Sequence, residues 1–129
     1  MVNHRELEIR STDDWVWQVH ENQSYLGRVV FRLRRTLTHS CAHCTDAEWI
    51  SLKNEFLSYE AFVARLFAPD RFNYDQLGNK YSQLHFHAVP RYKKPRLWEG
   101  YSFVDPHWGV NWSPAPTSPR AGSRPSASS

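Results

Sequence analysis

The stretch Gln83-Leu84-His85-Phe86-His87-Ala88-Val89-Pro90-Arg91 sets two histidines among bulky apolar residues. Side chains of a β-strand point alternately to its two faces. A strand over this stretch therefore predicts a packed face made of the even-numbered residues Leu84, Phe86 and Ala88. The other face carries the odd-numbered residues Gln83, His85, His87 and Val89. Pro90 predicts the end of the strand, because proline cannot donate to a sheet ladder.

Two imidazoles on one face of a strand permit three interpretations. Both can be structural side chains of a half-exposed face. With a third ligand they can bind zinc or another divalent ion. One neutral imidazole can also attack an electrophilic phosphorus while its neighbour stabilises the developing charge through a hydrogen bond. The spacing alone does not choose among the three.

The length and composition of the chain favour one domain with a substantial core. The chain has 129 residues, of which 40% are hydrophobic and 15% aromatic, and this is enough for one folded domain. No apolar run approaches the ~20 residues that a membrane helix needs. Residues 1–6 show no apolar signal core. We therefore expect a cytoplasmic protein with no membrane partner.

The charge of the chain argues against a surface dedicated to nucleic acid. The formal charge is +3, and Arg120 and Arg124 carry two of these charges, which leaves +1 for residues 1–112. Nucleic-acid-binding domains usually carry a strong basic stripe. Two local basic clusters, at residues 32–35 and 91–96, fit either solvated surface or a phosphate-bearing ligand, which guanidinium groups suit well.

Cys41 and Cys44 form a Cys-x-x-Cys pair flanked by histidines. Such a pair can supply half of a zinc site or a redox pair. No second cysteine cluster and no thioredoxin-like βαβ pattern accompanies it, so ordinary loop cysteines are the favoured interpretation. A metal site that combines His85 and His87 with these cysteines stays an alternative.

Residues 15–20 and 28–33 predict an antiparallel pair of strands, joined by the polar segment 21–27. In the second strand, Arg28 and Arg32 point to the face opposite the apolar residues. The apolar faces of the two strands consist of Trp15, Trp17 and Val19, and of Val29, Phe31 and Leu33.

Thr45-Asp46-Ala47-Glu48 is a capping-box signal that predicts the start of a helix. Apolar residues at steps of three and four then form an amphipathic stripe, and Pro69 predicts the end of the helix near Phe67. The stripe is interpreted as core packing and consists of Trp49, Leu52, Phe56, Tyr59, Val63 and Leu66.

Residues 71–76 predict a third strand, followed by a turn or loop before the histidine strand. Beyond Arg91 the chain reads as irregular, with aromatic side chains that cover the sheet or a partner. Residues 113–129 contain four prolines, six serines and no large apolar residue. This composition predicts a folded domain over residues 1–112 and a disordered Pro/Ser-rich tail.

The segment from Gly78 to Tyr92 resembles the signature of the histidine triad (HIT) family. In that signature three histidines alternate with apolar residues, two apolar residues and often Pro-Arg follow, and a loop with Gly or Asn precedes. The order of strands and capped helix over about residues 13–112 is also similar to a HIT domain. The resemblance implies an α+β fold, a HIT-like antiparallel β-sheet with one main amphipathic helix.

The resemblance also implies roles for particular residues. His85 would attack the α-phosphate of a nucleotide and form a nucleotidyl-histidine intermediate, and His87 would contact the phosphate or the leaving-group oxygen. Asn79 and, as a weaker candidate, Gln76 would contact phosphate or ribose, and His20 would lie near the ribose. The base pocket would be formed by hydrophobic side chains around Trp17, Val19, Val30 and Leu37.

Gln83 departs from the family pattern, because it stands where the first histidine of the triad is expected. Glutamine can donate and accept hydrogen bonds but cannot shuttle a proton near neutral pH. The departure leaves two possibilities open. Gln83 can keep a supporting role in an active enzyme, or the chain can be a nucleotide-binding module with little or no turnover.

The leading expectation is a HIT-like nucleotide hydrolase or nucleotidyl transferase with His85, His87 and Gln83 as catalytic residues. Its substrate would be a dinucleoside polyphosphate or a nucleoside phosphoramidate, cleaved at the α-phosphate. The protein itself would need no metal, although Mg²⁺ can accompany a polyphosphate substrate. HIT domains commonly pair through their sheets, so the resemblance also implies a homodimer in which residues 97–112 help to cover the shared surface.

Overall fold

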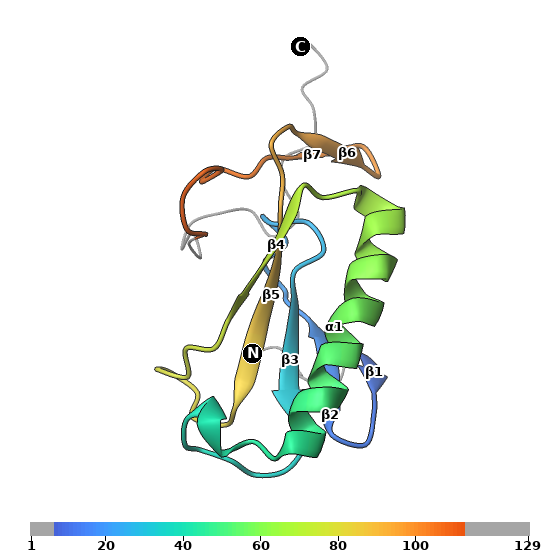
Figure 1. The fold of residues 1–129 in the computed structure, drawn as a ribbon. Coiled ribbons are helices and arrows are strands. Elements are labelled where there is room, and N and C mark those ends of the chain that lie inside the picture. Colours follow the sequence, from blue (N-terminus) through green and yellow to red (C-terminus); the bar gives the residue numbers. More distant parts are fainter. Residues whose placement is uncertain (1–6, 113–129) are drawn as a thin grey trace.

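The structure is a computed structural model that describes residues 7–112. It consists of a five-stranded antiparallel sheet, one long helix and a separate two-stranded hairpin (Figure 1). The expected tail, residues 113–129, lies outside the described residues. The elements in chain order are β1 Glu8–Ser11, β2 Trp15–Val19, β3 Val29–Leu33, the 3-10 turn η2 Cys41–His43, α1 Asp46–Phe67, β4 Arg71–Asp75, β5 His85–Arg91, β6 Arg96–Trp98 and β7 Tyr101–Phe103.

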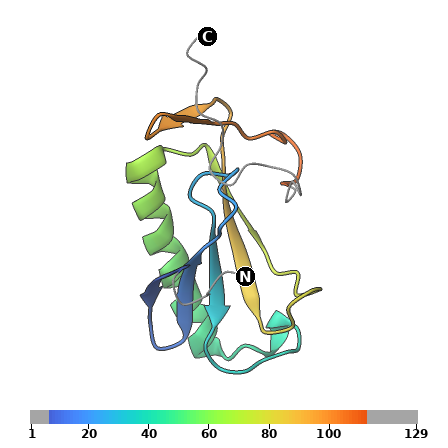
Figure 2. The same ribbon diagram turned by 180° about the vertical axis from the view of Figure 1, so that it is seen from behind.

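The main sheet has the strand order β1-β2-β3-β5-β4, so the histidine strand β5 lies between two neighbours. α1 packs against one face of this sheet, and the view from behind shows the opposite face without a helix among the described residues (Figure 2). The predicted α+β fold with one main helix is confirmed. The part of the chain from residue 7 to residue 112 contains no helix that is long and apolar enough to cross a bilayer.

The core lies between α1 and the sheet and is rich in aromatic side chains. Phe31 on β3 meets Tyr59 and Phe56 of α1 edge to face, with ring centroids 5.4 Å and 5.0 Å apart, an arrangement that aromatic quadrupoles favour. The predicted alternation of buried and half-buried side chains is confirmed on β3 and over residues 84–88. The buried members of the core are Trp15, Trp17, Val29, Phe31, Leu33, Leu37, Cys44, Leu52, Tyr59, Val63, Leu84, Phe86 and Ala88.

The predicted capping box is present at the start of α1. The Glu48 backbone N–H donates to the Thr45 hydroxyl at 3.1 Å, and the Thr45 N–H donates to the Glu48 carboxylate at 2.8 Å. These bonds satisfy two of the free donors of the first turn. The helix ends at Phe67 as predicted, and Arg96 of β6 donates to the carbonyls of Phe67 and Ala68 there.

The predicted apolar stripe is correct in its centre and wrong at its two ends. Trp49 and Leu66 are 38% and 40% exposed. Two glutamates, Glu48 and Glu55, are buried on the packed side instead. Glu55 is satisfied there because its carboxylate accepts a hydrogen bond of 2.9 Å from the Trp17 indole N–H.

The prediction that Pro90 ends the histidine strand is wrong. β5 continues to Arg91. The pairing of β3 with β5 reaches only as far as Ala88. Beyond that point β5 pairs with β4 alone, with Pro90 opposite Phe72. Pro90 therefore lies at a local sheet edge, where the missing N–H breaks no ladder.

The expectation of irregular chain beyond Arg91 is wrong for β6 and β7, which form a hairpin. Glu99 and Gly100 connect the two strands, and both have positive φ, 51° and 80°. Two positive φ values define a type I′ turn, whose twist matches that of the flanking strands. β1 was also not predicted, because the polar sequence Glu-Ile-Arg-Ser of this exposed strand shows no clear alternation.

Candidate functional site

The register of the sheet places both strand histidines on the face opposite α1. Phe86, between them in sequence, pairs with Phe31 and is buried under the helix. His87 pairs with Val30 of β3 on one side and with Asp75 of β4 on the other. His85 pairs with Arg32. Paired residues share a face, so these side chains together form the open face of the sheet.

Two hollows flank the histidines on this face. The first has a volume of about 560 Å³ and includes Arg32, the neighbour of His85. The second has a volume of about 520 Å³ and includes Asp75, the neighbour of His87. Each hollow is thus lined by a residue that is paired with one of the two histidines on the neighbouring strand. Their lining residues are Glu8, Ser11, Val16, Arg32 and Arg34 for the first, and Phe72, Asn73, Tyr74, Asp75, Leu77, Asn111 and Trp112 for the second.

The hydrogen bond of His85 defines which of its nitrogens carries the proton. Nδ1 lies 2.8 Å from the backbone carbonyl oxygen of Gln83. A carbonyl oxygen can only accept, so Nδ1–H donates to it. In the neutral ring Nε2 then carries the lone pair, which is the arrangement that a nucleophile needs. The side chain is partly exposed at the surface of the sheet.

His87 has the opposite arrangement. Its Nδ1 lies 3.5 Å from Nη2 of Arg28, and a guanidinium can only donate. Nδ1 therefore accepts, and the neutral ring carries its proton on Nε2. Burial lowers the pKa of His87 to about 3, and the nearby charges of Arg28, His85 and His20 lower it further in that order. His87 is thus a neutral hydrogen-bond donor at physiological pH.

His20 lies directly after β2 and joins this group. Its ring centroid is 6.3 Å from that of His87. The backbone N–H of Asn22 donates to Nδ1 of His20 at 3.0 Å, so His20 also carries its proton on Nε2. Burial, and then the charge of Arg28, lower the pKa of His20 to about 4. The structure therefore brings together three of the predicted residues, His20, His85 and His87, as the ring contacts between them show.

Arg28 and Trp112 also belong to this cluster, although neither was predicted as a site residue. Arg28 is only 2% exposed, and the centre of its guanidinium lies 4.7 Å from the centroid of the Trp112 ring. Trp112 in turn lies 5.5 Å from the ring of His87 and donates its indole N–H to Asp75. Strand alternation had placed Arg28 on the correct face. The sequence predicts that aromatic side chains beyond Arg91 cover the sheet or a partner, but it does not indicate that Trp112, 84 residues later, lies on Arg28.

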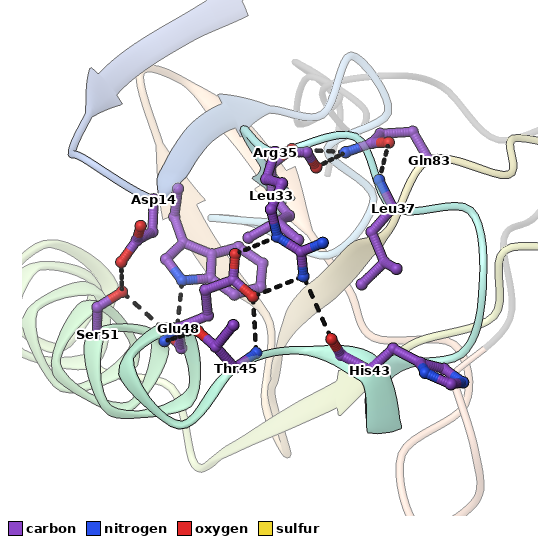
Figure 3. Close-up of polar contacts among 10 residues, drawn as sticks. Asp14, Leu33, Arg35, Leu37, His43, Thr45, Glu48, Ser51 and Gln83 are labelled. Atoms are coloured by element: carbon purple, nitrogen blue, oxygen red, sulfur yellow. Dashed lines mark hydrogen bonds and ion pairs between the residues drawn. The ribbon is translucent and has the colours of Figure 1, made fainter.

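Gln83 contacts His85 through its backbone carbonyl, whereas its side chain binds the segment after β3. β5 begins at His85, so the strand alternation that predicted a shared face does not extend to Gln83. Its amide oxygen accepts from Leu37 N at 3.0 Å, and its amide nitrogen donates to the carbonyls of Leu33 and Arg35 at 2.7 Å and 2.8 Å (Figure 3). Both amide hydrogens are thereby used. Gln83 contacts the His85 ring through its own carbonyl oxygen.

Arg35, whose carbonyl accepts from Gln83, links this segment to the start of α1. Arg35 donates two hydrogen bonds of 2.9 Å to the carboxylate of Glu48 and a third of 3.2 Å to the carbonyl of His43 (Figure 3). The hydrogen bond from Arg35 is the main reason why the pKa of Glu48 falls to about 2. The beginning of the histidine strand, the segment after β3 and the N-terminus of α1 are thus held by one network.

Two other predicted contacts, Asn79 and Gln76, lie in the loop between β4 and β5. Asn79 is exposed in a bend. Nothing in the described part of the chain links either amide to the three imidazoles by a hydrogen bond, so their role stays a prediction.

The expected base pocket is mostly wrong. Trp17 and Val19 pair with Phe31 and Val29 on the packed face, and Leu37 belongs to the buried core. Of the four residues only Val30 lies on the histidine face, opposite His87. The error follows from the period-two alternation, which puts the odd-numbered residues of β2 under the helix.

The basic cluster at residues 91–96 is not a uniform solvated surface, because Arg91 is 3% exposed. Its guanidinium makes five hydrogen bonds, and these go to both oxygens of Asp105, to Asn73, and to the carbonyls of His107 and Val110. A guanidinium has five N–H donors. Arg91 is therefore fully satisfied within the protein and has no donor left for a phosphate.

Cys41 and Cys44 are both free, and they pack in the core or against it. Burial raises the pKa of the Cys44 thiol. Across residues 7–112, the histidine, cysteine, aspartate and glutamate side chains form no group of three or more that could hold a metal ion.

Several solved structures with a similar fold are described as histidine triad or HIT family proteins. One from Bradyrhizobium japonicum is 20% identical, with a TM-score of 0.61 and coverage of 86% of this chain and 80% of that one. One from Sinorhizobium meliloti is 19% identical, with a TM-score of 0.61 and coverage of 90% and 85%. A HIT family protein from Bacillus anthracis is 14% identical, with a TM-score of 0.60 and coverage of 67% of this chain.

This chain spans only 64% of the Bacillus anthracis protein. No protein-family model matches the sequence, and no curated protein matches it. At these low identities the likeness establishes the fold. The chain therefore has a HIT-like fold. The side chains of His85 and His87 lie on the face of its sheet that α1 does not cover.

The hydrogen bonds of Gln83 predict a structural role for its side chain. Gln83→Ala should lower the free energy of unfolding by about 1–3 kcal/mol, because it leaves the Leu37 N–H and two carbonyls without their partner. Urea unfolding monitored by tryptophan fluorescence measures this. Gln76→Ala in the β4–β5 loop is the matched control and should change stability by less than about 0.5 kcal/mol. Equal effects of the two substitutions would contradict the assignment.

The lowered pKa values of His20 and His87 predict that acid destabilises the fold. In the folded state these values are about 4 and about 3, below the ordinary 6.5. The unfolded chain therefore binds more protons near pH 5, and unfolding should take up about two protons there. The free energy of unfolding should fall as pH is lowered from about 7 to about 5.

Urea unfolding across this pH range is the measurement. Glu48 does not interfere, because its contribution to stability is lost only below its ordinary pKa of 4.5. A variant that combines His20→Gln with His87→Gln should lose most of the pH dependence. A wild-type stability that stays constant over this range would show that the two rings are not held neutral.

Proposed function

We propose that this protein is a HIT-type nucleotide hydrolase or nucleotidyl transferase with His85 as its nucleophile. The observation that carries the proposal is the difference between the hydrogen-bond partners of two neighbouring rings. The carbonyl of Gln83 fixes the proton of His85 on Nδ1, whereas Arg28 fixes the proton of His87 on Nε2. One ring thus offers a lone pair, and a ring 5.2 Å away offers a donor.

The proposed reaction has two displacement steps at phosphorus. In the first step Nε2 of His85 forms a bond to the α-phosphorus, and the bond from phosphorus to the leaving group breaks with its electron pair on the leaving atom. An amine leaving group takes up a proton from solvent as this bond breaks, whereas a phosphate leaves as an anion. In the second step the oxygen of water, or of another acceptor, bonds to phosphorus and loses its proton to solvent. The N–P bond then breaks, and His85 regains its lone pair. This division into two steps is nucleophilic catalysis.

The neighbouring residues have positioning and stabilising roles in this proposal. His87 and His20 donate from Nε2 to oxygens of the phosphate or the sugar, which places fixed dipoles where negative charge develops. Gln83 positions His85 through its carbonyl, and Asn79 and Gln76 contact the substrate from the β4–β5 loop. Dinucleoside polyphosphates and nucleoside phosphoramidates are the proposed substrates. Mg²⁺ would enter with the polyphosphate and not as a resident metal.

A nucleotide-binding module with little turnover is the second candidate. The observation that favours it is again Gln83, whose amide is fully engaged with the backbone and supplies no titrating proton. Such a module would bind AMP saturably and release no product from nucleotide conjugates. Formation of a nucleotidyl adduct on His85 separates the two candidates.

Removal of the proposed nucleophile gives the direct test. His85→Gln should reduce the turnover of diadenosine polyphosphates and of adenosine phosphoramidate by at least about a thousandfold, as expected for loss of a covalent nucleophile. Initial rates and the intact mass of the wild-type adduct provide the readouts. His39→Gln, at an exposed position outside the sheet, is the matched control and should keep the wild-type rate. A His85→Gln enzyme with unchanged turnover would remove the mechanism.

A homodimer belongs to the same proposal. It is supported by exposed apolar side chains on segment 97–112, where Leu97, Val104 and Val110 are 72%, 55% and 65% exposed. Light scattering at micromolar concentration should give twice the chain mass of 15.2 kDa. A mass equal to that of one chain would contradict the dimer.

A further inference from the structure

Arg28 is a buried cation whose hydrogen bonds are largely missing. It is 2% exposed, and its Nε and Nη1 atoms have no hydrogen-bond partner among the described residues. The remaining nitrogen, Nη2, has a single long contact of 3.5 Å to His87. Burial of an ionised group without partners is strongly unfavourable.

Arg91 provides an internal comparison for Arg28. Both guanidiniums are buried on the open side of the sheet, with exposures of 2% and 3%. Arg91 has an ion pair of 2.6 Å with the buried carboxylate of Asp105, and all five of its donors are used. Arg28 has no carboxylate partner among the described residues. The fold can thus satisfy a buried arginine completely, and at Arg28 it does not.

The surroundings of Arg28 keep it charged and supply no anionic partner for it. Burial lowers the pKa of Arg28 only to about 10, so the guanidinium is protonated at neutral pH. Its neighbours are the neutral rings of His87 and His20, the side chain of Tyr25 and the face of Trp112. The indole stabilises the cation through its π face but offers no acceptor to the N–H groups. Trp112 also lines the hollow of about 520 Å³.

We propose that Arg28 is the phosphate-binding cation of this site, and that Trp112 covers it when no ligand is bound. This inference rests on the nucleotide site proposed above and adds the group that holds the phosphate. A phosphate monoester carries the charge and the acceptor oxygens that Nε and Nη1 lack, and a guanidinium can bind it with two parallel hydrogen bonds. His87 then contributes its Nε2–H beside the same phosphate.

The first test measures stability without ligand. Arg28→Met removes the charge and keeps a side chain of similar length, so the ligand-free protein should unfold at a higher temperature than the wild type. A purely structural arginine would give the opposite result. Arg65→Gln, on the exposed surface in the last turn of α1, is the matched loss of one positive charge. Because it removes a favourable interaction with the helix dipole, it should lower the unfolding temperature slightly and not raise it. A lower unfolding temperature of Arg28→Met would overturn the proposal.

The second test measures binding of AMP, inorganic phosphate and adenosine by calorimetry. Arg28→Met should weaken AMP and phosphate at least about tenfold and should leave adenosine unchanged, because only the charged group meets Arg28. Arg28→Lys, which keeps the charge but not the fork, should have an intermediate affinity, and Arg65→Gln should match the wild type. Trp112→Ala should strengthen phosphate binding, since it exposes the guanidinium.

The outcomes separate this inference from the proposed function. Phosphate binding that requires Arg28, without added affinity for AMP, would support the anion site and remove the nucleotide site. AMP binding that is equal in wild type and Arg28→Met would overturn the role of Arg28 and leave the nucleotide proposal intact. Absence of binding of both AMP and phosphate to the wild type would overturn both. Weaker phosphate binding in Trp112→Ala would overturn the covering role of Trp112.

Discussion

The antiparallel pairing of β3 with β5 is the constraint on which the site depends. This pairing sets Phe31 against Phe86 under the helix and thereby turns His85 and His87 to the opposite face. A shift of one residue would exchange the two sets of side chains. Burial of two aromatic rings on one side is therefore what determines the position of two imidazoles on the other. The network from Gln83 to Arg35 and Glu48 holds the start of this pairing in place.

The chemistry of the open face arises from the groups that bond each ring. A carbonyl oxygen can only accept and a guanidinium can only donate, so the partners of His85 and His87 favour different tautomers although the two residues are two positions apart on one strand. The same guanidinium, together with burial, lowers the pKa values of His87 and His20. One arginine therefore influences both the contacts and the charge of the neighbouring imidazoles.

Local patterns in the sequence predicted the elements that are governed by local rules. The alternation of β3 and the capping box of α1 follow from neighbours within a few residues, and the structure confirms them. On β2 the alternation of burial is absent, because Val16 and Gln18 are buried as well. The Glu99-Gly100 turn is not among the predicted elements, although its glycine is typical of such hairpins. β1 could not be predicted, because a short exposed strand is stabilised by its partner and not by its own pattern.

The details of the site depend on contacts between distant segments, and these were harder to predict. The sequence placed His20, His85 and His87 together, and the resemblance to the HIT family supplied the reason. It did not reveal that Gln83 binds the segment after β3, because that contact joins residues about fifty positions apart. It also assigned Trp17 to a ligand pocket, although its strand position puts it under the helix. The burial of Arg28 depends on Trp112, which reaches the sheet only in the folded chain.

The five hydrogen bonds that Arg91 donates limit how far the backbone at Trp112 can move. Arg91 donates hydrogen bonds to the backbone carbonyls of His107 and Val110, and Val110 is only two residues before Trp112. An extended chain spans at most about 3.3–3.6 Å per residue, so the tryptophan backbone is tethered within about 7 Å of a fixed anchor. While these bonds persist, the backbone at Trp112 stays close to the sheet. Arg91 and Asp105 therefore restrain the residue that covers Arg28.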